Sequence, residues 1–368
     1  MPESLTSEHL QLRSSAATFA TDVLLPRRDG GEQAVREIVE LAKAAAFFTM
    51  TQPKAFGGSE ATTLELSIVR DEIAAHNPPF LHAVFGPGPG VLGGVQEPLR
   101  TTHLTPLIAG EKKSAFGFTE PDEAPRATWG VLAGDELIVN GQKSYVTGGA
   151  QADFINTLVQ IEDHGPALVV IDTNTPGVER VRDFSSLDGS THAAFEFRDV
   201  HLSKTHIIGQ PGEGLPRAMK QIGDTRLAIA AQCVGWMRWL LDYLTDHLNS
   251  PTRGGRKRGD REGVRLRYAE LRIQAYAARS MLYRTARLAD SGENIVNEGI
   301  ACKVFASEAV GQIVDTAIQL VGGVALVDGH PLEMLYRQVR ALRLAEGGSD
   351  VLRLNLAKGQ LELQKGRI

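Results

Sequence analysis

The sequence predicts an α+β fold in which a helical part, a small β part and a second helical part follow one another. Apolar residues recur at helical spacing before about residue 110, alternate with polar residues between about 111 and 213, and return to helical spacing after that. We therefore expect an N-terminal helical domain over residues 1–110, a middle antiparallel β domain over 111–213 and a C-terminal four-helix bundle over 214–368.

Composition narrows the class of protein. The chain has 368 residues, of which 42% are hydrophobic and 23% charged, with a net charge of -5. This composition is typical of a globular protein. The negative net charge favours neither nucleic acid nor an anionic membrane as a general partner. The longest apolar runs fall far short of a membrane span, and no secretory signal or metal-binding spacing is evident. Cys233 and Cys302 lie in apolar helical stretches, which predicts buried thiols and a cytoplasmic protein.

The first hundred residues are read as helices broken by two loops. Apolar residues such as Val35, Ile38 and Ala42 follow helical spacing. Loops are expected at 52–58 and 86–94. The second contains a nominal GxGxxG, but its prolines leave no room for the helix that a dinucleotide site requires.

The middle part reads as strands. Glu136–Val139 and Gln142–Thr147 flank Asn140-Gly141, which predicts a hairpin with a type I′ turn at these two residues. Further strands are expected at 154–160, 167–172 and 193–197, with turns at 175–177 and 188–189.

The last part reads as long helices, expected at 215–248, 263–290, 297–320 and 348–364. In the second of these, one apolar stripe is predicted to be the buried face: Leu266, Ala269, Ile273, Ala277 and Met281. A basic run from Arg253 to Arg267 is interpreted as a solvated loop. If it has a function, it is expected to bind cofactor phosphates more readily than nucleic acid.

Four short segments hold candidate functional residues. Glu346 follows an apolar step and precedes Gly347-Gly348, an environment that suits a base, although a helix end is the simpler interpretation. Thr119 ends a predicted strand before Pro121, and Tyr145 and Thr147 share one face of another. Gln319 precedes Gly322-Gly323, which cap a helix or permit close approach of a cofactor.

Taken in order, these segments resemble the acyl-CoA dehydrogenase family over nearly the whole chain. The resemblance is carried by six motifs in matching order: Phe118-Thr119-Glu120-Pro121, Asn140 to Gly149, Phe195 to Val200, Asp224-Thr225-Arg226, Gln319 to Gly323, and Tyr336 to Ser349.

The resemblance implies an FAD-dependent enzyme that removes hydrogen from Cα and Cβ of an acyl-CoA thioester, or of an acyl group on a carrier protein. Glu346 matches the base that takes the α-proton. Arg226 and Thr225 are expected to line the substrate site, and a structural, salt-bridged arginine is an equal alternative for Arg226. The expected contacts to FAD are Phe116, Phe118, Thr119, Tyr145, Val146, Thr147, Gln319, Gly322, Gly323 and Gly348.

The expected partners follow from the same resemblance. They are an electron-transfer flavoprotein or similar acceptor and other subunits in a homotetramer or homodimer, because Gln319, Gly322 and Gly323 match residues that reach the FAD of a neighbouring subunit. A hetero-oligomer is the alternative.

Departures from the family pattern leave other functions open. Pro125 stands where the family has a serine that contacts CoA, and Arg253–Gly259 replaces the family's Arg-x-x-Phe-Gly. A non-catalytic or half-site subunit of a mixed oligomer is one alternative, and a flavin-dependent oxidase or monooxygenase is another. Thr225 stands near the slot where some members carry the base, and it is not acidic.

Overall fold

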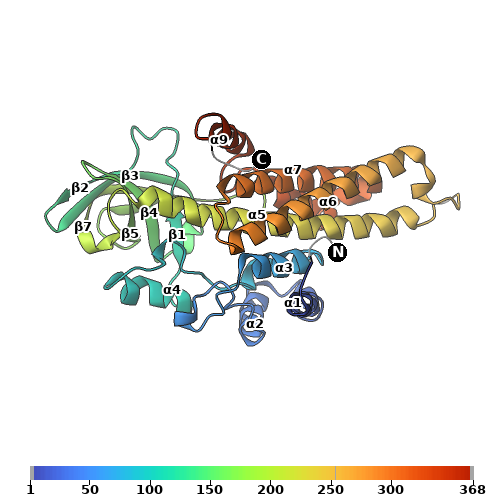
Figure 1. The fold of residues 1–368 in the computed structure, drawn as a ribbon, viewed down its shortest axis with the longest axis horizontal. Coiled ribbons are helices and arrows are strands. Elements are labelled where there is room, and N and C mark those ends of the chain that lie inside the picture. Colours follow the sequence, from blue (N-terminus) through green and yellow to red (C-terminus); the bar gives the residue numbers. More distant parts are fainter. Residues whose placement is uncertain (1–3, 253, 365–368) are drawn as a thin grey trace. The chain divides into compact units, whose positions relative to one another are not determined.

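The computed structural model describes residues 4–252 and 254–364 and divides into two compact units (Figure 1). The helical unit comprises the residues up to Met50, Glu60–Phe85 and those from Gly223 onward. The sheet unit comprises Thr51–Ser59 and Gly86–Ile222. The division of the chain at residues 110 and 213 stays a prediction. Arg253 and Met1 to Glu3 lie outside the described residues.

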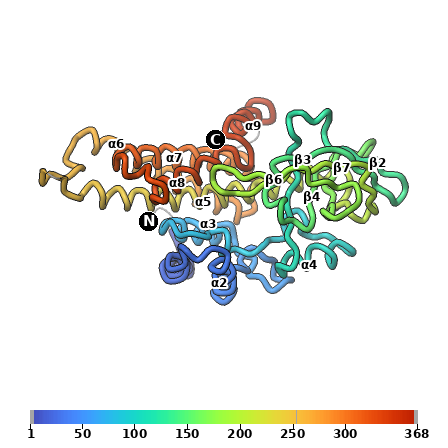
Figure 2. The backbone as a smooth tube through the Cα atoms, turned by 180° about the vertical axis from the view of Figure 1, so that it is seen from behind, coloured from blue at the N-terminus to red at the C-terminus, as the bar shows by residue number. Residues whose placement is uncertain are grey.

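The helical unit is built from long α-helices. They are α1 (Ser7–Phe19), α2 (Gly31–Ala44), α3 (Thr63–Ala74), most of α5 (Gly214–Asn249), α6 (Glu262–Asp290), α7 (Val296–Val321), α8 (Pro331–Ala341) and α9 (Ser349–Leu361). The bounds of α5, α6 and α7 agree closely with the prediction, whereas α8 was not predicted. In Figures 1 and 2, α5, α6 and α7 run alongside one another, with α8 lying against α7.

Buried polar contacts join α3 to its neighbours. Asp71 is fully buried on α3 and accepts hydrogen bonds from Arg238 (2.9 Å), Arg279 (3.2 Å) and Tyr283 (2.8 Å). These donors come from α5 and α6, so one carboxylate ties three helices together. At the C-terminal end of α6, Asp290 accepts from two backbone amides in the first turn of α3.

The predicted buried face of α6 is wrong. Leu266 is 67% exposed and Ile273 61% exposed, whereas a different stripe packs into the core: Leu271, Ala275, Ala278 and Leu282. Helix α6 is apolar on two sides, and periodicity alone does not say which side faces its own chain.

Helix α7 is a core helix. Among the described residues it alone has the length and composition of a membrane span, which corrects the expectation that every apolar stretch falls far short of one. Its buried residues, which include Cys302, Ala306, Val310 and Val314, belong to the main hydrophobic cluster. Cys233 is buried in the same cluster, so the prediction of two buried thiols is confirmed.

The described part of the sheet unit holds eight strands, in the order β6-β7-β3-β2-β4-β5-β8 with β1 beside β4. Their bounds are β1 (Ser114–Gly117), β2 (Trp129–Ala133), β3 (Glu136–Thr147), β4 (Phe154–Ile161), β5 (Gly165–Asp172), β6 (Val178–Ser185), β7 (Thr191–Ser203) and β8 (Ile207–Ile208). The short helix α4 (Thr105–Ala109) also belongs to this unit. Most pairs are antiparallel, but β4 pairs in parallel with β1 and β2, so the sheet is mixed.

The predicted hairpin turn at Asn140-Gly141 is also wrong. Strand β3 runs straight through these residues, and the β2–β3 turn lies earlier, at Gly134-Asp135. The Asn140 side chain exchanges hydrogen bonds with Asp199, where β7 carries an extra residue at φ +46°. The Asn-Gly pair therefore serves a β-bulge instead of a turn.

Candidate active site

Glu346 lies in the loop between α8 and α9. Its backbone is left-handed, with φ +55°, and Gly347 follows at φ +105°. The amide of Ser349 donates to the carbonyl of Arg343 across the loop at 2.9 Å. A non-glycine residue in this region is strained, and such strain is concentrated at functional sites. The geometry therefore favours a functional position over an ordinary helix end.

Two cationic side chains hold this loop by its backbone. Nε of Arg226 donates to the carbonyl oxygen of Glu346 at 3.0 Å. Nζ of Lys303 donates to the carbonyl oxygen of Gly347 at 2.9 Å. Arg226 extends from α5 and Lys303 from α7, so both packed helices define where the loop runs.

The Glu346 carboxylate itself is left unpaired within the described part of the chain. Neither cation lies within ion-pair distance of it, and burial raises its pKa, while Arg226 and Lys303 oppose the rise. Burial disfavours the charged form because a carboxylate loses water there without gaining hydrogen bonds. The result is a carboxyl group that accepts a proton more readily than an exposed glutamate.

The amide of Glu346 is available as well. In the described ranges it donates to no carbonyl or side chain, and neither do the amides of Gly347 and Gly348. A free backbone N–H beside a carboxylate suits the binding of a carbonyl oxygen. The predicted site residue Gly348 precedes the first residue of α9, and a Cβ added there would meet only Leu344, at 3.8 Å.

Arg226 is the predicted substrate residue that the structure brings to Glu346. Its neighbour Thr225 is half-buried on α5, and Asp224 is exposed. Burial lowers the pKa of Arg226. Because its Nε contacts the backbone of the loop, Arg226 positions Glu346 whatever else it contacts.

The predicted residues at the end of α7 lie far from Glu346. Gln319 follows Lys303 by sixteen residues on one straight helix, which corresponds to about 24 Å. Gly322 ends the helix at φ +94°, and a Cβ added at Gly322 or Gly323 would meet no atom of the chain. The positive φ of Gly322 and the open space beside both glycines therefore fit close approach by another molecule.

In the sheet unit, a buried lysine anchors the segment that follows β1. Nζ of Lys143 donates to the carbonyl of Phe118 at 2.9 Å and pairs with Glu120. The amide of Ser144 donates to the carbonyl of Thr119 at 3.0 Å. The rings of Phe116 and Phe118 stack at 5.9 Å. The predicted residues of this segment are thus held against β3.

Tyr145 projects from a bulge in β3. Its φ is +57° and its side chain is 68% exposed, whereas the side chain of Val146 is buried. Its ring meets the edge of Phe184 at 5.5 Å, and Oγ1 of Thr147 lies 3.2 Å from Nδ1 of His192. Tyr145 and Thr147 therefore project from the same face, as predicted, beside two residues that the prediction missed.

Lys303 and Lys143 were also missed. Each is a lysine among apolar or strand residues, with a side chain that is fully buried. Such a position is the signal that sequence reasoning could have used, because buried lysines are rare unless they are paired. His192 and Phe184 carry no comparable signal.

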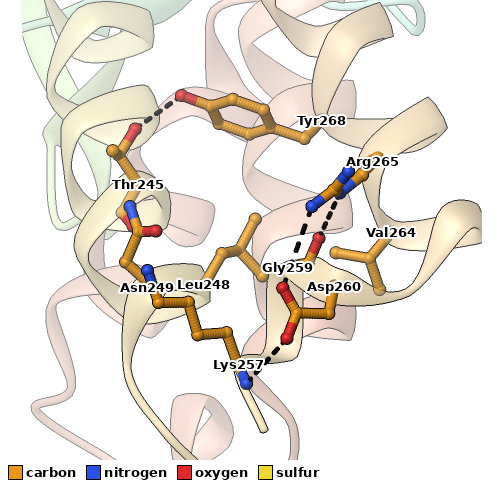
Figure 3. Close-up of a pocket in the computed structure, with 9 residues that line it drawn as sticks. All are labelled: Thr245, Leu248, Asn249, Lys257, Gly259, Asp260, Val264, Arg265 and Tyr268. Carbon is orange, nitrogen blue, oxygen red and sulfur yellow. Dashed lines mark hydrogen bonds and ion pairs between the residues drawn. The ribbon is translucent and has the colours of Figure 1, made fainter.

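A separate cavity of about 260 Å³ lies between the end of α5 and the start of α6 (Figure 3). It includes two members of the basic run, Lys257 and Arg265, and the hydroxyls of Thr245 and Tyr268 bond to each other beside it. None of the predicted site residues lines this cavity.

Comparison with known proteins decides the family. The acyl-CoA dehydrogenase N-terminal domain model matches residues 6–111, and the C-terminal domain model matches 212–361. The chain belongs to the acyl-CoA dehydrogenase family. The family, the α+β fold and the flavoprotein oxidoreductase class predicted from the sequence are therefore confirmed.

Two relatives cover almost the whole chain. A 3-(aryl)acrylate reductase of Clostridium sporogenes is 28% identical over 97% of this chain and 99% of its own. The CarC subunit of a caffeyl-CoA reductase–Etf complex of Acetobacterium woodii is 26% identical over 94% and 96%.

Solved structures of the same fold agree. A probable acyl-CoA dehydrogenase of Mycobacterium abscessus has a TM-score of 0.85 and 26% identity, covering 96% of this chain and 98% of its own. The structure of PigA with FAD and proline has a TM-score of 0.83 and 21% identity, covering 96% and 97%, and shows the shared fold.

Proposed function

We propose that this acyl-CoA dehydrogenase family member binds FAD and oxidises the Cα–Cβ bond of an acyl-CoA thioester, with Glu346 as the base that takes the α-proton. The observation that carries the proposal is the Glu346 carboxylate, which is half-buried and unpaired among the described residues, in a loop that Arg226 and Lys303 hold by its backbone. A carboxylate neutralised by an ion pair would be a poorer base.

Each group at the proposed site has one role in the reaction. FAD, when bound, supplies the acceptor for the β-hydrogen, which leaves with its electron pair. The Glu346 carboxylate takes the α-proton. The Glu346 amide is free to donate to the thioester oxygen, which makes the α-proton more acidic. Arg226 keeps the loop in place during both events.

The sheet unit offers groups that suit a flavin. The exposed aromatic ring of Tyr145 gives a planar contact, and Thr119 and Thr147 are exposed residues of the same unit. The strained backbone of Tyr145 is a second mark of a functional position. Phe116, Phe118 and Val146 join these contacts in the proposal, whereas Gln319, Gly322 and Gly323 serve the FAD of a neighbouring subunit.

Reduction of a double bond is the second candidate, because two similar proteins are named as reductases. The same residues serve the reverse step: a hydride adds at Cβ, and Glu346 returns its proton to Cα. The redox partner then decides the direction. An electron-transfer flavoprotein is the partner that we propose, because CarC belongs to a complex that contains one.

Exposed apolar faces support a homo-oligomer. On α6, Leu266, Ile273 and Tyr276 project from one side, and Val324, Leu326 and Val327 are exposed after α7. Apolar faces of this kind mark interaction surfaces.

We place the protein in the cytoplasm, as its composition predicts.

The test is the flavin spectrum of the purified protein under anaerobic conditions. Addition of acyl-CoA thioesters of graded length and branching should bleach the flavin in the wild type and should leave it oxidised in Glu346→Gln. The corresponding 2-enoyl thioesters, added to chemically reduced protein, test the reverse direction. A colourless protein would favour the non-catalytic subunit, and rapid peroxide formation in air would favour the oxidase.

A further inference from the structure

Lys303 is the most unusual charged residue near the loop of Glu346. Its side chain is fully buried on α7, between Cys302 and Val304. Moving an ammonium out of water is costly unless acceptors replace the water. The acceptors here are two carbonyl oxygens of one loop, those of Gly347 at 2.9 Å and Arg343 at 3.5 Å.

These two carbonyls flank the base. Arg343 precedes Glu346 by three residues, and Gly347 follows it directly. One ammonium group that holds both carbonyls closes the loop around the left-handed backbone of Glu346. Loss of the ammonium group would leave the half-buried carbonyl of Gly347 without its donor.

The charged and titratable groups that act on Lys303 lie on α5, on α7 and in the loop of Glu346. Glu346 in the loop and Glu308 on α7 favour the ammonium form, whereas Arg226 on α5 disfavours it. Cys233 on α5 is also close, and burial raises the pKa of its thiol, so the thiol stays neutral. Burial lowers the pKa of Lys303 itself to about 8, so it remains mostly charged at neutral pH.

We propose that Lys303 is a positioning residue for Glu346, which holds the loop through Gly347 and Arg343 and eases ionisation of the carboxylate through its positive charge. The proposal deepens the proposed function and rests on it for the role of Glu346. The hydrogen bonds of Lys303 hold the loop in place, and its positive charge eases ionisation of the base, which is the part that can be measured.

Two variants remove the charge of Lys303. Lys303→Gln keeps an N–H donor for the carbonyls but removes the charge, and Lys303→Met removes both. The exposed Lys358 on α9, which pairs with Glu362 at 3.9 Å, gives the control variant Lys358→Met. The readout is the ionisation midpoint of the Glu346 carboxyl, followed by NMR in protein carrying ¹³C-labelled glutamate, with Glu346→Gln used to assign the signal.

The midpoint should rise by about one pH unit in Lys303→Gln and Lys303→Met and stay unchanged in Lys358→Met. The midpoint of flavin bleaching with an acyl-CoA should rise with it. An unchanged Glu346 midpoint in Lys303→Gln would overturn the proposal, even if Lys303→Met failed to fold. If no thioester bleached the wild type while the Glu346 midpoint still shifted, the proposed function would fail and the role of Lys303 would stand.

Discussion

Glu346 joins a strained backbone to a carboxyl group that burial keeps from ionising readily. Both properties cost stability, and both suit the base that we propose. The loop tolerates them because Arg226 and Lys303 hold it from two helices. Such a loss of stability is common at active sites and fits the proposed role of Glu346.

The linkage between pH and stability follows from the raised pKa of Glu346. Between the ordinary pKa of 4.5 and the raised value, the folded protein holds a proton that the unfolded chain has lost. Stability therefore falls as pH rises through this window.

Glu346→Gln should remove that cost and stabilise the protein near pH 7 by about 1 kcal/mol. Near pH 4 the gain should vanish, because the carboxyl group is then neutral in both states. Urea unfolding at the two pH values, followed by circular dichroism, measures the difference. An equal effect at both values would mean that ionisation of Glu346 is not the cause.

At the scale of elements, Lys143 clamps the segment after β1 to β3. Its buried ammonium binds Glu120 and the carbonyl of Phe118, and burial lowers its pKa while Glu120 opposes the shift. Lys143→Met would leave the carbonyl of Phe118 without its donor and Glu120 with only the amide of Thr128, and it should destabilise the sheet unit by about 3 kcal/mol.

The matched control for this variant is Lys204→Met, which breaks an exposed pair with Asp135 and should cost less than about 1 kcal/mol. Denaturant unfolding measures both variants. Similar losses in the two would show that the Lys143 clamp is no stronger than a surface pair.

The bounds of elements with long periodic patterns were predictable from the sequence. Which face of such an element is buried, and where a turn lies, were not. The bounds of α6 follow from apolar spacing, but its second apolar stripe made the buried face ambiguous. An Asn-Gly pair such as Asn140-Gly141 suits a β-bulge as well as a turn. The β2–β3 turn lies at Gly134-Asp135, and Ala133 pairs with Glu136 across it.

Part of the candidate site was predictable as well. Glu346 and Tyr145 were identified from motifs, and the structure adds that the backbone of both residues is left-handed. Lys303 contacts the Glu346 loop across a separation of more than forty residues in sequence. No local pattern encodes such a contact, because it depends on how α7 packs against the loop.

At the scale of the whole molecule, the exposed stripe of α6 predicts assembly with further copies of the chain. Ile273→Glu places a charge in the middle of Leu266, Ile273 and Tyr276 and should lower the mass measured by light scattering after size exclusion. Arg272→Glu, on the neighbouring exposed position, is the control and should keep the wild-type mass. A wild type that is already monomeric would contradict the assembly.

The central claim is that Glu346 removes the α-proton, and hydrogen exchange at that carbon tests it most directly. The purified protein is incubated without oxygen in D₂O with an acyl-CoA analogue that cannot lose its β-hydrogen, and deuterium at Cα is measured by mass spectrometry. The wild type and Asp224→Asn should exchange the α-hydrogen, and Glu346→Gln should not. Exchange that survives in Glu346→Gln and is lost in Asp224→Asn would contradict the account and move the base to α5.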